Sequence, residues 1–243
     1  MNKWAPSDDK LQLTSIWSFP DRGSWATHNG NYPGNWSPYI PRNVIKRYSN
    51  KGDVVLDPFL GSGTTLIEAK LLGRKGIGVD INSNAIQIAK DNCSFSYPDT
   101  EEAKFIVGDA LHLNFIHGNS IDLICTHPPY ANIIRYSNGL KGDISLYDID
   151  KFLLSMQQVS EELFRVLKRG KYCAFLIGDV RKNGRVIPLG FKILEIFQKS
   201  GFVLKEIVIK EQHNCKSTDK WKEKSIQYNF LLLAHEYLFI LLK

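Results

Sequence analysis

The chain has 243 residues, of which 43% are hydrophobic and 23% are charged. This composition is typical of a soluble globular domain with one sizeable core. No apolar run approaches the roughly 18 residues that a membrane span needs, and the N-terminus has no targeting pattern, so a cytoplasmic protein is predicted. The net charge of +6 is compatible with a polyanionic partner but does not establish one. The cysteines are scattered singly, which predicts neither a disulfide framework nor a metal site: Cys93, Cys125, Cys173 and Cys215.

The first 35 residues are rich in aromatic residues and turn formers, and we expect them to be irregular. A helix is then predicted from Pro41 to Gly52, because proline is tolerated at the first helical position. After it, short apolar runs alternate with amphipathic segments. The expected strands are 54–57, 76–81, 104–109, 122–127 and 172–179, and the expected helices are 64–72, 84–92 and 151–167. This order predicts an α/β protein with a doubly wound, mostly parallel sheet covered on both faces.

The C-terminal part of the chain has a different pattern. Residues 202–209 and 230–242 are two β-rich runs separated by a polar segment, for which no helix is predicted. These runs are expected to pair antiparallel as a closing hairpin at one edge of the sheet. The prediction is therefore a seven-stranded sheet in a single domain, 1–243, that leaves no segment for a separate target-recognition domain.

A glycine-containing turn follows the first predicted strand. Gly61 and Gly63 let the backbone turn tightly at the N-terminus of the next helix, where it can approach a ligand. A dinucleotide-binding motif would need a third glycine where Leu66 stands, so a nicotinamide cofactor is disfavoured. Asp80 ends the next strand, and its carboxylate could hold a ribose diol.

Several segments resemble one known family. The sequence DPFLGSGTT (57–65) resembles the cofactor motif of amino-methylating (N4-cytosine and N6-adenine) DNA methyltransferases. Further segments look like that family's other motifs: YPGNWSPYIPRNVI (32–45), GRKGIGVDIN (73–82), VGDA (107–110), THPPY (126–130) and AHEYLFILLK (234–243). The resemblance implies a Rossmann-like methyltransferase fold and S-adenosylmethionine as the cofactor.

The resemblance also implies a set of cofactor-binding residues. The acid at the end of the second strand would hold the ribose, and the acid after the third strand would contact the adenine ring. The residues carried over are Tyr39, Asp57, Pro58, Phe59, Gly61, Ser62, Gly63, Thr64, Thr65, Asp80, Ile81, Asp109 and Ala110.

The segment His127-Pro128-Pro129-Tyr130 stands where the family has its catalytic motif. An exocyclic amine is a poor nucleophile because its lone pair is delocalised into the ring, and accepting its hydrogens localises that pair. The prolines fix the backbone and add no competing N–H, and Tyr130 can stack on a base rotated out of the duplex. The family has Asp, Asn or Ser where this chain has His127, and a histidine can accept only when it is neutral. The TSPPY-like frame slightly favours N4 of cytosine.

The polar segment 212–225 carries lysines and a tryptophan that could contact DNA phosphates and bases, although a solvated loop is equally consistent: Lys216, Lys220, Trp221 and Lys222. The expected partner is duplex DNA with a flipped target base, with a cognate restriction or specificity subunit as a further possibility. Two alternatives stay open. One is a methyltransferase for an RNA base or a protein glutamine, and the other is a catalytically weak S-adenosylmethionine-binding module.

Overall fold

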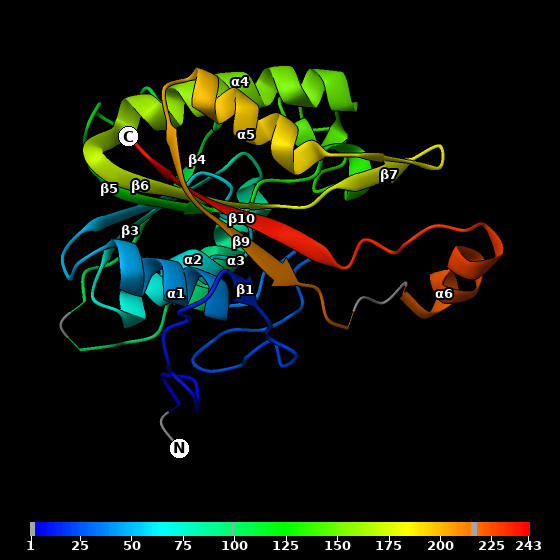
Figure 1. The fold of residues 1–243 in the computed structure, drawn as a ribbon. Helices are drawn as coiled ribbons and strands as arrows, with labels where there is room; N and C mark the ends of the chain where they lie inside the picture. The colour runs from blue at the N-terminus through cyan, green and yellow to red at the C-terminus, as the bar shows by residue number, and fades with distance from the viewer. Residues whose placement is uncertain (1–2, 99, 215–217) are drawn as a thin grey trace.

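The computed structural model describes residues 3–98, 100–214 and 218–243. Its main sheet has eight strands in the order β1-β9-β10-β6-β5-β2-β3-β4, and β7 and β8 form a separate hairpin (Figure 1). The strands of the main sheet are β1 Ile16–Trp17, β2 Val54–Asp57, β3 Lys75–Asp80, β4 Lys104–Val107, β5 Ile121–Thr126, β6 Leu167–Ile177, β9 Val203–Glu211 and β10 His235–Leu242. The hairpin strands are β7 Val180–Lys182 and β8 Arg185–Ile187.

The strand directions confirm a doubly wound, mostly parallel sheet. The pairs β2–β3, β3–β4, β2–β5 and β5–β6 are parallel, whereas β10 runs antiparallel to both β6 and β9. The strand order reverses between β2 and β5, and in open α/β sheets the carboxyl ends of the strands at such a point form the ligand-binding crevice.

One detail of the predicted sheet was wrong. The sheet has eight strands instead of seven, because Ile16 and Trp17 in the N-terminal segment pair with Ile209 and Lys210 of β9. The antiparallel closing pair of β9 and β10 forms at this end of the sheet, where the two-residue β1 lies outside it. A two-residue strand carries too little sequence periodicity to be recognised, and strand order is set by tertiary pairing.

The helices cover both faces of the sheet (Figure 1). On one face lie α1 Tyr39–Tyr48, α2 Thr64–Leu71 and α3 Ser83–Cys93, and on the other lie α4 Ile149–Val166 and α5 Leu189–Lys199. Two short 3₁₀ helices, η1 Ala131–Ile133 and η2 Ile144–Leu146, follow β5. The core between β6, β10 and α5 contains Phe175, whose ring stacks on Phe197 with centroids 4.5 Å apart.

Two helices were not predicted. The helix α5 is amphipathic, with Ile193 and Phe197 facing the core, but its segment was assigned no element from the sequence. The segment between β9 and β10 was predicted to contain no helix, yet α6 Thr218–Gln227 lies there and projects from the body of the molecule (Figure 1). Within the described ranges, no helix has the length and apolar character to cross a membrane.

The N-terminal segment packs against α1 and α2 through a buried carboxylate, Glu68. Its Oε1 accepts from Trp25 Nε1 at 2.6 Å and lies 2.7 Å from His28 Nε2, and its Oε2 accepts from Arg42 at 2.7 Å. Glu68 is fully buried, and Arg42 and His28 are nearly so. Arg42 also pairs with Asp9. Glu68 therefore ties Trp25 and His28 of the N-terminal segment to α1 and α2, in addition to the pairing of β1 with β9.

We expect Glu68→Ala to lower the free energy of unfolding by about 3–5 kcal/mol, because removing one partner of a buried ion pair leaves an uncompensated charge. Urea denaturation followed by circular dichroism would measure this. The matched control is Glu195→Ala, which removes an exposed acid paired with Lys199 one helical turn away and should leave the stability nearly unchanged, because solvent screens exposed ion pairs. A similar loss in both variants would contradict the assigned role of the Glu68 network.

Candidate cofactor and catalytic site

The site forms where β2 ends and α2 begins. Gly61 adopts a φ of +52° and Gly63 one of +87°, the left-handed conformation that glycine tolerates best. A Cβ on Gly63 would lie 3.0 Å from the Cβ of Ala89, so glycine also lets α2 pack closely on α3. The turn leaves the first backbone N–H groups of α2 without partners from a preceding helical turn, as an anion-binding helix N-terminus requires.

The carboxylate of Asp57 joins this turn to β5. Its Oδ2 accepts from the hydroxyl of Thr65 at 2.6 Å, and its Oδ1 accepts from the hydroxyl of Thr126 at 2.6 Å. The backbone N–H of Phe59 also donates to Oδ1, at 3.1 Å. Burial raises the pKa of Asp57 to about 6, against the opposing effect of these three hydrogen bonds. The end of β2, the start of α2 and the end of β5 are thus held by one side chain.

The acids at the ends of β3 and beyond β4 face the same space. Asp80 accepts from the backbone N–H groups of Gly61 and Asn82, each at 2.9 Å, and burial raises its pKa although these N–H groups act in the opposite direction. Asp109 accepts from the backbone N–H of Leu111 at 2.9 Å. Gly142 completes this end of the pocket, because a Cβ there would lie 2.9 Å from Ile81 Cδ1 and 3.4 Å from Asp109 Oδ2.

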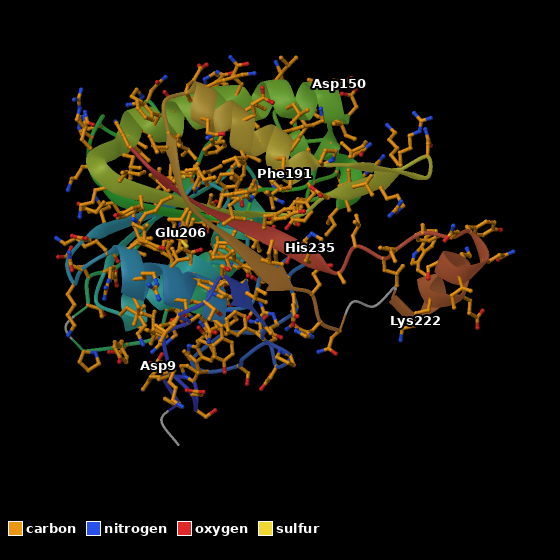
Figure 2. All side chains as sticks on the ribbon, in the orientation of Figure 1. Asp9, Asp150, Phe191, Glu206, Lys222 and His235 are labelled. Carbon is orange, nitrogen blue, oxygen red and sulfur yellow. The ribbon has the colours of Figure 1, made fainter. Side chains whose placement is uncertain are left out.

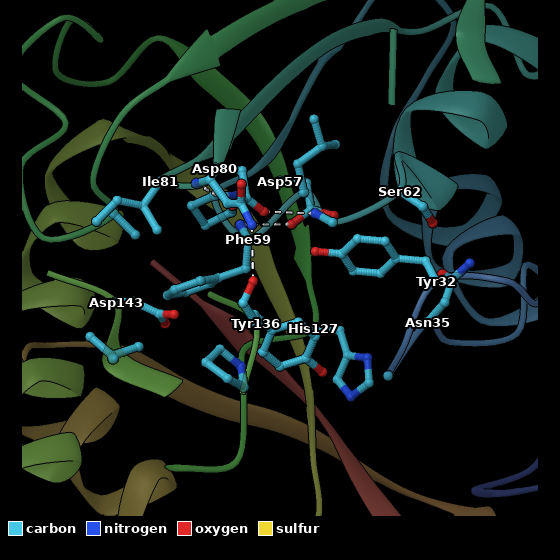
Figure 3. A pocket seen from close by; sticks show the side chains of 18 of the residues that line it. Tyr32, Asn35, Asp57, Phe59, Ser62, Asp80, Ile81, His127, Tyr136 and Asp143 are labelled. Carbon is cyan, nitrogen blue, oxygen red and sulfur yellow. Dashed lines mark hydrogen bonds between the residues drawn. The ribbon is translucent and has the colours of Figure 1, made fainter. Parts of the chain in front are cut away.

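One pocket collects most of the predicted cofactor residues, and it encloses about 790 Å³, part of it open to solvent. Figure 3 shows Asp57, Asp80 and His127 around this common space. The predicted residues that line it are Asp57, Pro58, Phe59, Gly61, Ser62, Asp80, Ile81, Asp109, Ala110, His127 and Pro129.

The other predicted residues support the pocket from outside or lie elsewhere. Thr64 donates to Asn35 at 2.6 Å, and Thr65 donates to Asp57. Gly63, Pro128 and Tyr130 do not line the pocket either. Tyr39 also lies outside the pocket lining: its ring stacks on Phe19 with centroids 5.0 Å apart and packs against Trp25.

Sequence reasoning missed part of the lining. Tyr32 and Trp36 belong to the segment 32–45 that resembles a family motif, but the resemblance implies only Tyr39 of that segment as a cofactor residue. Tyr136 and Asp143 come from the loop after the predicted catalytic motif, where no pattern in the sequence indicates a site residue. The rings of Tyr32 and Tyr136 stack with centroids 6.1 Å apart, and a Cβ on Gly34 would collide with the Tyr136 hydroxyl.

The predicted catalytic segment, 127–130, follows β5, whose residues are all buried. His127 is half-buried, and its ring stacks on Trp36 with centroids 5.5 Å apart. Its Nε2 lies 2.7 Å from the hydroxyl oxygen of Tyr130. Burial lowers the pKa of His127 to about 4, although the negative charge of Glu236 opposes this change. His127 is therefore neutral near pH 7 and able to accept a hydrogen bond.

The predicted DNA contacts lie apart from this pocket. Lys216 falls outside the described residues, and Lys220, Trp221 and Lys222 belong to α6. Figure 2 shows Lys222 on this projecting helix. Trp221 is 47% exposed and its ring packs edge-on against Phe230. In the part of the chain that the structure describes, no cluster of three or more His, Cys, Asp or Glu side chains could hold a metal ion.

The fold and pocket are those of the S-adenosylmethionine-dependent methyltransferase class. The chain matches a family model described as a methyltransferase domain over residues 49–229, so it belongs to the methyltransferase domain family. Residues 2–91 also match a model described as DNA methylase, which supports the resemblance to the amino-methylating DNA enzymes.

Curated relatives match only parts of the chain. The type II methyltransferase M2.LlaDCHI of Lactococcus lactis is 37% identical over 86 residues, which cover 34% of this chain and 31% of the relative. A tRNA (guanine(10)-N2)-dimethyltransferase of Methanothermobacter thermautotrophicus is 35% identical over 101 residues, covering 41% of this chain and 29% of the relative. The chain thus spans about a third of the length of the curated relatives it matches.

Solved structures support the fold over most of the chain. TrmN from Thermus thermophilus superposes with a TM-score of 0.58 at 20% identity, covering 87% of this chain and 50% of that one. An S-adenosylmethionine-dependent methyltransferase from Methanosarcina mazei gives a TM-score of 0.58 at 18% identity, covering 82% and 96%. At these identities the likeness concerns the fold alone.

The fold and the family imply S-adenosylmethionine as the cofactor, and the pocket residues fit it. Asp80 and Asp109 provide acceptors for hydroxyl and amino groups at one end, and the Gly61 turn lets the backbone approach closely. The space beside Ile81 and Asp109 is kept open by Gly142, where any side chain would fill it. We propose that Asp80 binds the ribose and Asp109 the adenine.

We expect Asp80→Ala to weaken S-adenosylmethionine binding by about 1.5–3 kcal/mol, the usual worth of a hydrogen bond to a charged group. Isothermal titration calorimetry measures the affinity directly. The matched control is Asp91→Ala, which removes an exposed acid of α3 and should leave the affinity unchanged. An unchanged affinity in folded Asp80→Ala protein would remove Asp80 from the site.

Proposed function

We propose that this chain transfers a methyl group from S-adenosylmethionine to the exocyclic amino group of a DNA base, with N4 of cytosine slightly favoured over N6 of adenine. The observation that carries the proposal is the position of His127. It follows β5 directly after Thr126, whose hydroxyl bonds Asp57 of the cofactor turn, and its ring lines the cofactor pocket. A neutral hydrogen-bond acceptor therefore stands at the pocket wall.

The bound cofactor would supply an electrophilic methyl group, and the side chains around it would prepare the amine. His127 accepts one amino hydrogen, and the backbone carbonyl of Pro128 is proposed to accept the other. Both contacts localise the amine lone pair toward the methyl group, and holding the two reactants together supplies much of the remaining rate enhancement. His127 then takes the proton that the methylated amine releases.

The proposal that Tyr130 stacks on the target base needs revision. Its hydroxyl is held by His127 and Glu236, and its ring does not line the pocket. Trp36, Tyr32 and Tyr136 do line it, so these rings are better placed to stack on a flipped base.

Duplex DNA is the proposed partner, with basic and aromatic groups outside the pocket as candidate contacts. Lys220, Trp221 and Lys222 on α6 would meet the backbone or an exposed base. The segment that follows α6 contacts the β7–β8 hairpin, because Arg181 donates to the carbonyl of Leu231 at 2.9 Å and lies over the ring of Phe230. A specificity or restriction subunit could add base readout.

An RNA base is the second candidate. The tRNA dimethyltransferase relative methylates N2 of a guanine by its printed name, and that nitrogen is also an exocyclic amine. The chemistry proposed for His127 would be the same for either nucleic acid.

Incubation with methyl-labelled S-adenosylmethionine and either duplex DNA or tRNA, followed by nucleoside analysis, tests the proposal. We expect label in N4-methylcytosine or N6-methyladenine from DNA. His127→Ala should lose about 10²-fold or more in single-turnover rate, since a general base contributes on that order, and His127→Asn, which restores an acceptor common in the family, should retain more.

The control His117→Ala removes an exposed histidine and should match the parent. Label in tRNA and none in DNA would replace the DNA proposal by the RNA one, and no transfer to either nucleic acid would contradict both.

The rate should also report the protonation of His127. With its pKa lowered to about 4 by burial, the imidazole stays neutral, so we expect a flat single-turnover rate from about pH 8 to about pH 5.5, falling only as pH drops further. A fall in the rate centred at about pH 6.5, the unperturbed pKa of histidine, would contradict the lowered pKa of His127. If His127→Asn shows the same fall, another group such as Asp57 is responsible.

A further inference from the structure

A chain of hydrogen bonds runs from His127 to the far side of β10. His127 Nε2 lies 2.7 Å from the Tyr130 hydroxyl oxygen, and that hydroxyl donates to Glu236 Oε1 at 2.6 Å. Lys210 Nζ in turn donates to Glu236 Oε2 at 2.8 Å. Lys210 and Glu236 are directly opposite each other on β9 and β10, so the sheet register itself holds the carboxylate in place.

The protons in this chain can be assigned one by one. Glu236 is a carboxylate, because the positive charge of Lys210 and the hydrogen bonds that it receives outweigh the effect of burial and lower its pKa. Burial, together with the nearby Glu236, raises the pKa of Tyr130 well above its usual value, so the phenol keeps its proton. A phenol has one proton to donate, and it goes to the carboxylate.

The Tyr130 oxygen can then only accept from His127. The hydrogen bond at Nε2 therefore requires a proton on that nitrogen. A neutral imidazole has one protonated and one unprotonated nitrogen, so Nδ1 carries the lone pair. Within the described residues Nδ1 makes no hydrogen bond, and the His127 ring lines the cofactor pocket.

We infer that Glu236 is a positioning residue that acts through Tyr130 to hold His127 as the Nε2–H tautomer, which leaves Nδ1 as the acceptor for the target amino group. The catalytic part of this inference rests on the proposed function, whereas the tautomer itself does not. After methyl transfer, the proton released by the amine would bind Nδ1, and the resulting imidazolium would be stabilised through Tyr130 by the negative charge of Glu236.

The packing around the chain supports a positioning role. Trp36 stacks on the His127 ring, which fixes its plane. A Cβ on Gly178 would lie 3.0 Å from Tyr130 Cε2 and 3.4 Å from Glu236 Cγ, so the glycine leaves room for both side chains. Glu236 is 7% exposed, and water therefore has little access to compete for Tyr130.

The decisive variant is Glu236→Gln, because an amide can donate where the carboxylate only accepts. Its NH₂ would donate to the Tyr130 oxygen, Tyr130 would donate to His127 Nε2, and the imidazole proton would move to Nδ1. In the parent, Nε2 of labelled His127 should give the ¹⁵N shift of a protonated nitrogen and Nδ1 that of an unprotonated one. At neutral pH we expect Glu236→Gln to reverse this assignment. The single-turnover rate should fall about tenfold or more, as expected when a catalytic histidine takes the wrong tautomer, with cofactor affinity retained.

The matched control is Glu206→Gln, which changes an exposed glutamate on the adjacent strand β9, labelled in Figure 2. It should leave both the ¹⁵N shifts and the rate unchanged. Should Glu236→Gln fail to fold, Tyr130→Phe removes the connecting hydroxyl and should produce a mixture of the two tautomers.

The spectra are recorded without a nucleic acid, so they test the tautomer even if no methylated product is found. Parent-like shifts in folded Glu236→Gln or Tyr130→Phe would overturn the inference. If the ¹⁵N shifts of the two ring nitrogens are reversed but the rate is unchanged, Glu236 sets the tautomer of His127, and its proposed role in catalysis is overturned.

Discussion

The hydrogen bonds of Asp57 are the constraint on which the site depends. One carboxylate is shared by Thr65 at the start of α2 and Thr126 at the end of β5. Asp57 ends β2, and β2 and β5 are neighbours at the point where the strand order reverses. The bond between Asp57 and Thr126 therefore fixes the distance between the glycine turn and His127. Burying a carboxylate costs free energy unless its oxygens are hydrogen-bonded, and the threonine hydroxyls and the Phe59 N–H meet that requirement.

Much of the fold follows from local pattern. The strands β2 to β5 are short runs that match the predicted ones, and the apolar second half of β6 lies in the predicted strand 172–179. The helices α2 to α4 begin and end within a few residues of their predicted positions. The helix α6 was not predicted because its lysine-rich sequence has no apolar stripe. The pairing of Ile16 with Ile209 joins residues far apart in the sequence, and local periodicity contains no information about such contacts.

The candidate site was predicted unevenly for a related reason. Residues on the glycine turn and at strand ends were found because motif position and strand geometry place them together. Glu236 was read only as part of the closing strand, since its connection to His127 crosses from β10 to β5 and depends on the side-chain direction of Tyr130. Tyr136 lies in an irregular loop and reaches the pocket only through tertiary packing.

The place of β10 in the sheet has a consequence for how the protein is made. Because β10 pairs with both β6 and β9, β9 can join the sheet only after residues 235–242 have left the ribosome. The strands β2 to β5 can pair earlier, and they carry the glycine turn and Asp57. During translation the cofactor half of the site can therefore form first, whereas His127 meets its carboxylate partner only as the last strand is inserted. Long-range pairing of this kind is slow relative to local contacts, which makes β10 insertion the step that brings Glu236 to Tyr130 and His127.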